Sequence, residues 1–197
     1  MTKRPCALLI ALAIVAGTAA DAATFRVVVD QTSVAFAVSS FPVGSHEGRF
    51  GLSSGRIVLD PERRSGSIEF VVDAGSVSTG WDLRDAFLKS DLMFDTQRYP
   101  SIRFRSTRLA FEGPRLVAVD GVMTLHGVAL PVRFDVLRID CGAETSPSHD
   151  GCEASVRGSI SRSAFGMPFG YPFVSDDVAL DFSIRAIRVR DERENGF

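Results

Sequence analysis

Hydrophobic and polar residues alternate along most of the chain, with the two-residue period that is typical of half-buried β-strands. Ile57 and Leu59 share one face of a predicted strand, and Ile68, Phe70 and Val72 share one face of the next. The pattern predicts about eight to ten strands joined by short, turn-rich connections. Their ranges are 25–38, with one break, 55–60, 67–74, 101–111, 116–126, 129–141, 153–165 and 178–189.

The alternation changes phase within three of these strands. A shift of one residue turns side chains to the opposite face, so each change predicts a bulge or a sharp bend. Long, strongly coiled strands are typical of barrels rather than flat sandwiches. We therefore expect an all-β domain with an antiparallel barrel of about eight strands. The three changes follow Phe104, Val136 and Ala186.

One segment departs from the strand pattern and predicts a helical insert near residues 80–95. Three apolar residues have the spacing of one helical face: Leu83, Ala86 and Phe87. Thr79 and Asp82 have the spacing of a capping box. We predict a helix over about 80–90 that lies across a sheet or caps one end of the barrel.

The first residues have the features of a signal peptide. Lys3 and Arg4 precede an apolar run at 7–20, and the small residues around Ala22 match a signal-peptidase site. The run has fourteen residues, whereas a membrane-spanning helix needs roughly 20. We therefore predict a signal peptide over 1–22, an exported protein, and one domain over 23–197.

Two cysteines remain in the predicted mature chain, Cys141 and Cys152, separated by a polar loop. Exported proteins fold in an oxidising environment, which favours a disulfide across this loop. The alternative is a metal site that includes His149. Two cysteines and one histidine form a poor zinc site without a fourth ligand, so we expect the disulfide and no metal.

The composition argues against nucleic-acid binding and favours an apolar barrel interior. The charges are interspersed and the net charge is −2, which gives no indication of nucleic-acid binding. Fifteen of the eighteen aromatic residues are phenylalanine, and phenylalanine brings no polar group into a dry cavity. An eight-stranded barrel either fills itself with side chains or encloses one small ligand. The apolar loop 164–173 fits either the rim of a pocket or a plug at one barrel end, and both alternatives stay open.

Residues with catalytic potential are sparse. The three histidines are far apart in sequence, and His126 fits a histidine at a strand end that is hydrogen-bonded to backbone. Aspartates near the predicted helix start are ordinary capping and surface charges. The sequence has no G-x-S-x-G motif and no phosphate loop. We therefore expect a protein that is not an enzyme and has no cofactor.

Several short motifs, in order and at consistent spacing, resemble those of the YceI-like family. Two positions differ from the family pattern. Phe87 stands where the family usually has histidine, and Ala164 stands where it often has aspartate. The motifs lie at 43–50, 55–60, 84–85 with 88–89, 94–95, 99–104, 125–128, 131–132, 162–167 and 174–176.

The resemblance implies a lipocalin-like barrel in the periplasm that binds, sequesters or carries a long-chain apolar lipid, a polyisoprenoid or isoprenoid quinone. It implies a long-chain isoprenoid or acyl lipid as partner. If the loop 164–173 is the rim of a pocket, the helix over 81–88 would be its lid. The alternative is a filled barrel that acts in stress response or contacts membrane proteins, without a lipid. Homodimerisation and transient membrane contact stay open. The residues expected to bind the ligand are Phe41, Phe50, Trp81, Phe87, Leu88, Phe94, Phe104, Phe165, Met167 and Phe169.

Overall fold

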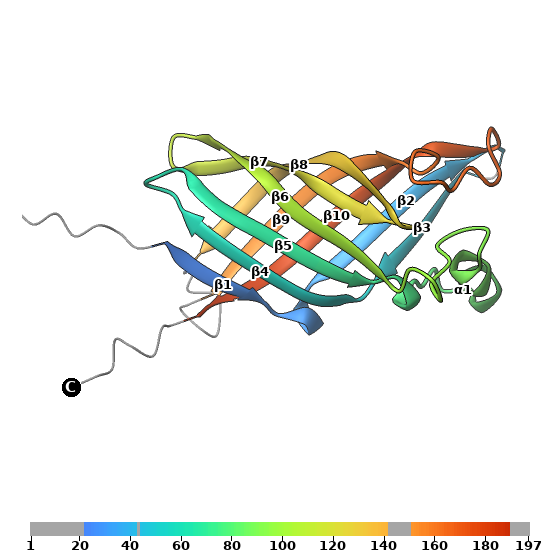
Figure 1. Ribbon diagram of the computed structural model, residues 1–197, viewed down its shortest axis with the longest axis horizontal. Helices are drawn as coiled ribbons and strands as arrows, with labels where there is room; N and C mark the ends of the chain where they lie inside the picture. The colour runs from blue at the N-terminus through green and yellow to red at the C-terminus, as the bar shows by residue number, and fades with distance from the viewer. Residues whose placement is uncertain (1–21, 43, 142–150, 190–197) are drawn as a thin grey trace, which may run out of the picture.

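The computed structural model describes residues 22–42, 44–141 and 151–189, which are mostly β-strand (Figure 1). The predicted signal peptide therefore lies outside the described residues, except for Ala22. The helices are two short 3-10 segments, Val29–Gln31 and Ala74–Ser76, and α1 (Asp82–Lys89). The strands are β1 (Ala23–Val27), β2 (Ser33–Ser40), β3 (Gly44–Phe50), β4 (Leu52–Asp60), β5 (Ser65–Asp73), β6 (Ser101–Glu112), β7 (Arg115–Leu125), β8 (Val128–Cys141), β9 (Gly151–Ser161) and β10 (Val174–Arg188).

The strands form a closed antiparallel barrel with eight strand positions. The order is β1-β4-β5-β6-β7-β8-β9-β10, and β10 pairs again with β1. Successive parts of β10 pair with β2 and with β1, so β1 and β2 are two halves of one long strand, separated by Val29–Gln31. In the same way β3 and β4 are separated only by Gly51, and they pair with β2 and β1. The predicted barrel and the predicted break within 25–38 are confirmed.

Two of the three predicted changes of phase correspond to register shifts. The pairing of β6 with β7 shifts between Ser106 and Arg108, and that of β8 with β9 shifts between Val136 and Arg138. The third prediction is wrong, because β10 stays in register with β9 through Ile187. Ile187 is only half-buried. An apolar residue at this strand end is therefore accommodated without a register shift.

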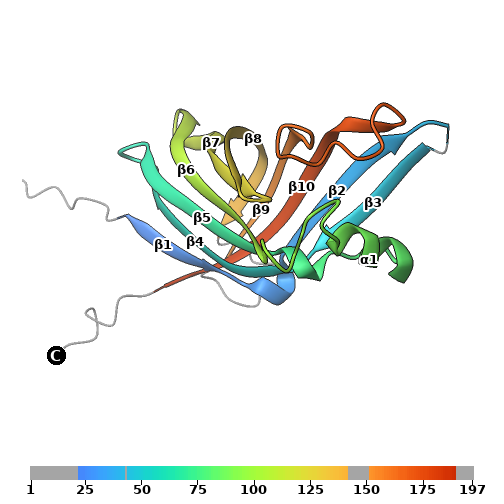
Figure 2. The same ribbon diagram turned by 45° about the vertical axis from the view of Figure 1, so that its right-hand side comes forward.

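The helix α1 lies at one end of the barrel, in the connection between β5 and β6 (Figures 1 and 2). The last residue of β5, Asp73, pairs with Ser101 at the start of β6, so the residues between them leave the wall of the barrel. Among the described residues, the edge of β3 that faces away from β2 is paired only through the bridge between Arg49 and Ser78. The insert therefore stands beside an open strand edge.

The start of the helix differs from the prediction. Gly80 has φ +77°, which no helical residue adopts, and α1 begins at Asp82 with Trp81 as its N-cap residue. The expected capping box does not form. The backbone N–H of Thr79 donates instead to Asp85 Oδ1 over 2.8 Å, and the Thr79 hydroxyl donates to the same oxygen. Among the described residues, no helix has the length and apolar composition needed to cross a bilayer.

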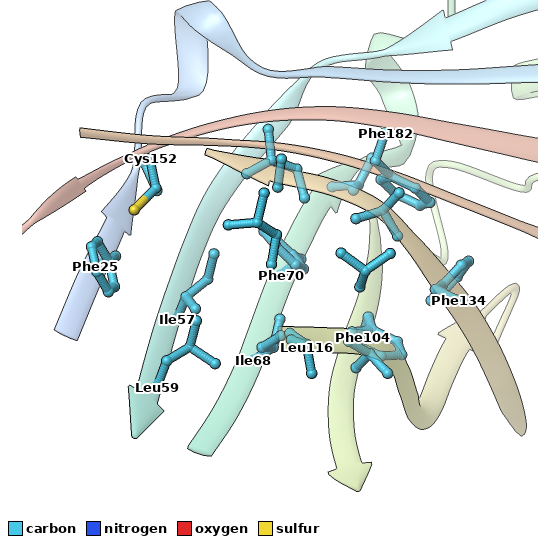
Figure 3. A pocket seen from close by; sticks show the side chains of 18 of the residues that line it. Phe25, Ile57, Leu59, Ile68, Phe70, Phe104, Leu116, Phe134, Cys152 and Phe182 are labelled. Atoms are coloured by element: carbon cyan, nitrogen blue, oxygen red, sulfur yellow. The ribbon is translucent and has the colours of Figure 1, made fainter. Parts of the chain in front are cut away.

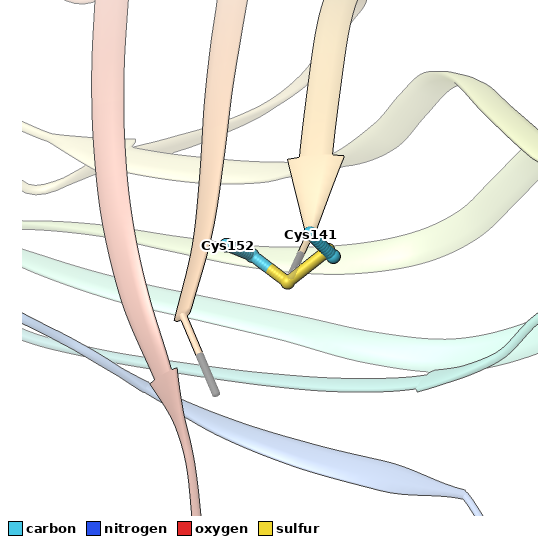
Figure 4. The surroundings of a disulfide bond; sticks show 2 residues. All are labelled: Cys141 and Cys152. Carbon is cyan, nitrogen blue, oxygen red and sulfur yellow. A yellow bond between two sulfur atoms is a disulfide. The ribbon is translucent and has the colours of Figure 1, made fainter. Parts of the chain in front are cut away.

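The opposite end of the barrel carries the disulfide between Cys141 at the end of β8 and Cys152 on β9 (Figure 4). This confirms the predicted disulfide. Thiols joined in this way cannot serve as thiolate metal ligands, so the alternative metal site is wrong. The third residue of that alternative, His149, lies outside the described residues.

Candidate functional site

The inward-facing side chains of the barrel leave space between them. An inner cavity of about 100 Å³ lies between the β-strands and reaches the disulfide (Figure 3). Its lining is apolar apart from Arg103, whose side chain is exposed on the outer side of β6. The residues labelled in Figure 3 are Phe25, Ile57, Leu59, Ile68, Phe70, Phe104, Leu116, Phe134, Cys152 and Phe182.

An outer cavity of about 240 Å³ lies nearer the end that carries α1. Its walls come from the inner faces of strands of the barrel, from β3, from the insert with α1 and from the connection 162–173 between β9 and β10. The outer cavity is also lined mainly by apolar side chains, but it includes four polar residues. These are His46, Thr79, Arg84 and Arg162.

The two cavities lie next to each other inside the barrel, and we call them together the lumen. Val72, Ile102, Met123 and Phe182 line both of them, and we call this shared set the waist. Each waist residue is on the inward face of its strand. The outward neighbour of Met123 on β7, Val122, is 37% exposed, whereas Met123 is 5% exposed. The alternation seen in the sequence therefore lines the interior of the barrel with apolar side chains.

Several phenylalanine rings pack closely against glycines of the neighbouring strand. A Cβ atom built on Gly48 would lie 2.3 Å from the ring of Phe36, and one on Gly158 would lie 2.5 Å from the ring of Phe134. Both pairs are direct cross-strand neighbours. Because the glycines have no side chain, each ring can rest on the wall of the barrel. The large aromatic content of the lining thus remains compatible with an open lumen.

We call the end of the outer cavity beside α1 the mouth. A cluster of polar side chains there joins α1 to β2 and β3. Arg84 donates from Nε to Thr79 Oγ1 (2.8 Å), and its Nη1 lies 3.1 Å from His46 Nδ1. A guanidinium can only donate, so His46 Nδ1 accepts and His46 Nε2 donates to Ser40 Oγ (2.8 Å). The hydrogen bond from the Thr79 hydroxyl is the main cause that holds the pKa of Asp85 below its ordinary value. We call Ser40, His46, Thr79, Arg84 and Asp85 the mouth cluster.

The loop 162–173 on the other side of the mouth is organised by Arg162. This side chain is 4% exposed, and its guanidinium is satisfied by backbone carbonyl groups. The acceptors are the carbonyl oxygens of Ser175 (2.7 Å), Met167 (2.6 Å), Phe169 (2.6 Å) and Val174 (2.8 Å). One buried cation therefore ties together both ends of an otherwise apolar loop.

The structure brings seven of the ten predicted ligand-binding residues to the lumen. Phe41 and Trp81 do not line it, because the turn after β2 and the N-terminus of α1 leave them 78% and 59% exposed. Phe165 is 2% exposed and packs in the barrel core, where its carbonyl lies 3.1 Å from His126 Nδ1. Contact of the seven with a ligand stays a prediction. They are Phe50, Phe87, Leu88, Phe94, Met167 and Phe169 in the outer cavity and Phe104 in the inner one.

The face of α1 that meets the lumen also differs from the predicted one. Leu83 is 70% exposed, and the residues that line the outer cavity are Arg84, Phe87 and Leu88. The mouth cluster and Arg162 were not predicted as site residues. His46 and Arg84 are distant in sequence and meet only because β3 has an open edge beside the helix. His126 Nδ1 donates to the backbone carbonyl of Phe165, so this histidine is hydrogen-bonded to backbone, as predicted.

Comparison with known proteins agrees with this geometry. The family model for the YceI-like domain matches residues 25–186. A UPF0312 protein of Shewanella denitrificans (strain OS217) is 28% identical over 195 residues, which cover 95% of this chain and 100% of that protein. A UPF0312 protein of Vibrio vulnificus (strain YJ016) is 31% identical over 149 residues, which cover 73% of this chain and 78% of that protein.

Solved structures share the barrel. BcnA of Burkholderia cenocepacia has a TM-score of 0.65 at 22% identity, with 81% of this chain and 98% of BcnA covered. A polyisoprenoid binding domain from Saccharophagus degradans, implicated in plant cell wall breakdown, has a TM-score of 0.63 at 21% identity, with 84% and 98% covered. At these identities the likeness shows the fold. Together with the family match over most of the chain, it shows that this protein belongs to the YceI-like family.

Proposed function

We propose that the protein binds a lipid with a long apolar chain, a polyisoprenoid or an isoprenoid quinone, inside its barrel and sequesters or carries it. The observation that carries this proposal is the apolar lumen formed by the inner cavity, the waist and the outer cavity. The polyisoprenoid binding domain of Saccharophagus degradans, which has the same fold, supports it. An open lumen favours lipid binding over the alternative of a filled barrel.

The driving force would be transfer of the chain from water, not chemistry. Each CH₂ group removed from water contributes about 0.8 kcal/mol. Ordering of a flexible chain and loss of its free motion offset much of this gain. An apolar lumen discriminates poorly between chains that differ by one methylene. The lumen therefore supports a class of ligand, long and apolar, rather than one chain length.

The mouth cluster supports a polar head group at the outer end of the lipid. Three of the five N–H groups of Arg84 are engaged, by Thr79 Oγ1, the Thr79 carbonyl and His46 Nδ1. Among the described residues, no carboxylate lies within 4.0 Å of the Arg84 guanidinium. The remaining donors and the positive charge suit an oxygen acceptor, such as a quinone carbonyl, a phenolic oxygen or a phosphate.

The predicted signal peptide and the disulfide support export to the periplasm. Membership of the YceI-like family points to a binding protein rather than an enzyme.

Blocking the waist tests the proposal. The indole of a Met123→Trp variant would occupy the waist, whereas Val122→Trp places the same group on the outer face of the same strand. Delipidated proteins would be titrated with a long-chain isoprenoid quinone. We expect Met123→Trp to bind at least roughly tenfold more weakly than Val122→Trp, since chain contacts worth about 1.4 kcal/mol already change affinity tenfold. Equal binding by both folded variants would contradict the proposal.

A further inference from the structure

Large exposed apolar side chains gather at one end of the barrel. Eleven such side chains are found among the described residues, and seven of them belong to the segments around the mouth. These segments are the turn after β2, the insert with α1, and the loop 162–173, which lie together at one end in both views (Figures 1 and 2). We call the seven the rim patch: Phe41, Trp81, Leu83, Leu92, Phe169, Tyr171 and Phe173, exposed by 53–78%.

The three segments of the rim patch are connected into one surface. The backbone N–H of Phe41 donates to the carbonyl of Phe173 over 2.8 Å, which joins the turn to the loop. The ring centroids of Phe87 and Phe169 lie 5.0 Å apart, which joins α1 to the loop. Exposed apolar side chains gathered on one surface mark interaction sites, so this end of the barrel has the features of a docking surface.

The rim patch is continuous with the lumen. Phe169 is 53% exposed and also lines the outer cavity. A largely apolar path therefore leads from the outside of the mouth to the waist, and the charged residues that line it are Arg84 and Arg162. A water-insoluble lipid could follow this path only if the mouth faces the phase in which the lipid is dissolved.

The charges of the mouth indicate which surface it would meet. Residues 81–100 carry four aspartates and three basic side chains, and the loop 162–173 adds only the buried Arg162. This balance lacks the basic cluster that anionic lipids attract. Trp81 and Tyr171, with an apolar ring and one polar atom, are the residue types enriched where a membrane meets water.

We propose that the rim patch docks on a lipid bilayer through apolar insertion and opens the lumen toward it. This inference rests on the proposed lipid-binding function and names the surface from which the ligand would enter. Docking would not need anionic lipid. A second copy of the chain is a less suitable occupant, because two barrels joined mouth to mouth would close each lumen to the lipid phase.

The sole tryptophan of the chain, Trp81, is 59% exposed on the rim patch and reports docking directly. Vesicles of phosphatidylcholine alone, or of phosphatidylcholine with phosphatidylglycerol, would be added to the mature protein. We expect a blue shift of the emission and co-sedimentation with both vesicle types, to a similar extent. No shift and no co-sedimentation, or binding only to the anionic vesicles, would overturn the proposal.

Two matched double variants distinguish docking through the rim patch from non-specific adsorption to vesicles. Leu83→Ser with Phe173→Ser removes two rim residues that do not line the lumen, whereas Val122→Ser with Leu137→Ser removes two exposed residues of the barrel wall. We expect the partition coefficient of the rim variant into vesicles to fall at least roughly tenfold. The wall variant should partition like the wild type. Equal loss in both would overturn docking through the rim.

Two further measurements distinguish bilayer docking from dimerisation and from quinone binding. Sedimentation velocity without vesicles should show the same oligomeric state for the wild type and the rim variant. If the wild type is a dimer and the rim variant is a monomer, the rim patch binds a second copy of the chain and the proposal is overturned. Binding of a quinone in detergent solution is measured separately. Protein that binds the quinone but ignores vesicles would overturn docking and leave the proposed function standing, and docking without quinone binding would contradict the function alone.

Discussion

The ring of Phe87 on α1 packs against the ring of Phe169 in the loop 162–173, with centroids 5.0 Å apart and planes inclined by 58°. Both residues line the outer cavity. None of the residues of α1 is fully buried. This contact, the mouth cluster and the packing of Leu88 against the core attach the helix to the barrel. Phe87 and Phe169 therefore bridge the mouth between the helix and the loop.

Phe87→Asp should abolish lipid retention while leaving the barrel folded. A carboxylate against an apolar chain costs several kcal/mol unless it protonates, and 1.4 kcal/mol corresponds to about a tenfold loss of affinity. Ala86→Asp is the control, because Ala86 is exposed one position earlier on the same helix. The measurement is lipid content by mass spectrometry, with circular dichroism for the fold. A Phe87→Asp variant that keeps its lipid would show that the helix does not cover the ligand.

Arg162→Ala should destabilise the protein far more than removal of an exposed arginine. The substitution removes the donor of four carbonyl groups, one of them in a buried hydrogen bond and three in part-buried ones. A buried group left unpaired costs about 1–3 kcal/mol. We expect the free energy of unfolding to fall by roughly 3 kcal/mol. Arg157→Ala, which breaks an exposed ion pair with Asp181, should cost about 0–1 kcal/mol. Urea unfolding compares the two variants, and similar losses would show that Arg162 does not organise the loop.

The mouth cluster should be sensitive to acid. Asp85 has a pKa below its ordinary value of 3.8, chiefly because the Thr79 hydroxyl donates to it. For a carboxyl group with a lowered pKa, the stabilisation is complete above the unfolded-state value and is lost as the pH falls through the folded-state value. The attachment of α1 should therefore hold at neutral pH and weaken below about pH 3.8.

Thr79→Val tests the cause of that shift. The variant keeps the shape of the side chain but removes the hydroxyl donor, so the pKa of Asp85 should rise toward its ordinary value. Titration of the Asp85 carboxyl by NMR measures this directly. The stability difference between the wild type and the variant should shrink as the pH falls below that range. An unchanged pKa of Asp85 in the variant would show that the hydroxyl is not its main partner.

Replacing both cysteines of the disulfide by serine should lower the free energy of unfolding by about 3 kcal/mol. Such a loss is expected in the chain-entropy model for a loop of this length, with a sequence separation of 11. Lipid binding should persist at saturating lipid, because the disulfide borders only the inner end of the lumen. Chemical denaturation and quinone binding check the two halves of this prediction. Loss of lipid from a folded variant would show that the disulfide end of the barrel is required for retention.

The barrel could be predicted from the sequence because alternation is a local signal. The inward positions of β6, β7, β8 and β10 follow from the two-residue period, and two register shifts were visible as changes of phase. Ile187 shows the limit of that signal, since an apolar residue at a strand end can be half-buried without any shift.

The details of the mouth could not be predicted, because they depend on contacts between distant segments. His46 meets Arg84 only after β3 is left with an open edge, and Arg162 binds carbonyls that no sequence pattern marks. The helix face was misassigned for a similar reason. Spacing alone places Leu83 and Phe87 on one face, but the mouth cluster turns Arg84 inward and leaves Leu83 outside.

Native mass spectrometry of the mature protein, purified without detergent from the cells that produce it, tests the central claim most directly. We predict a complex of one chain with one lipid, and collisional release of a long-chain isoprenoid that carries an oxygen-containing head group. The same protein after organic extraction should regain that mass when the quinone is added. Protein that is folded but carries no lipid, and takes up none when the quinone is offered, would contradict the account of the lumen as a lipid-binding site.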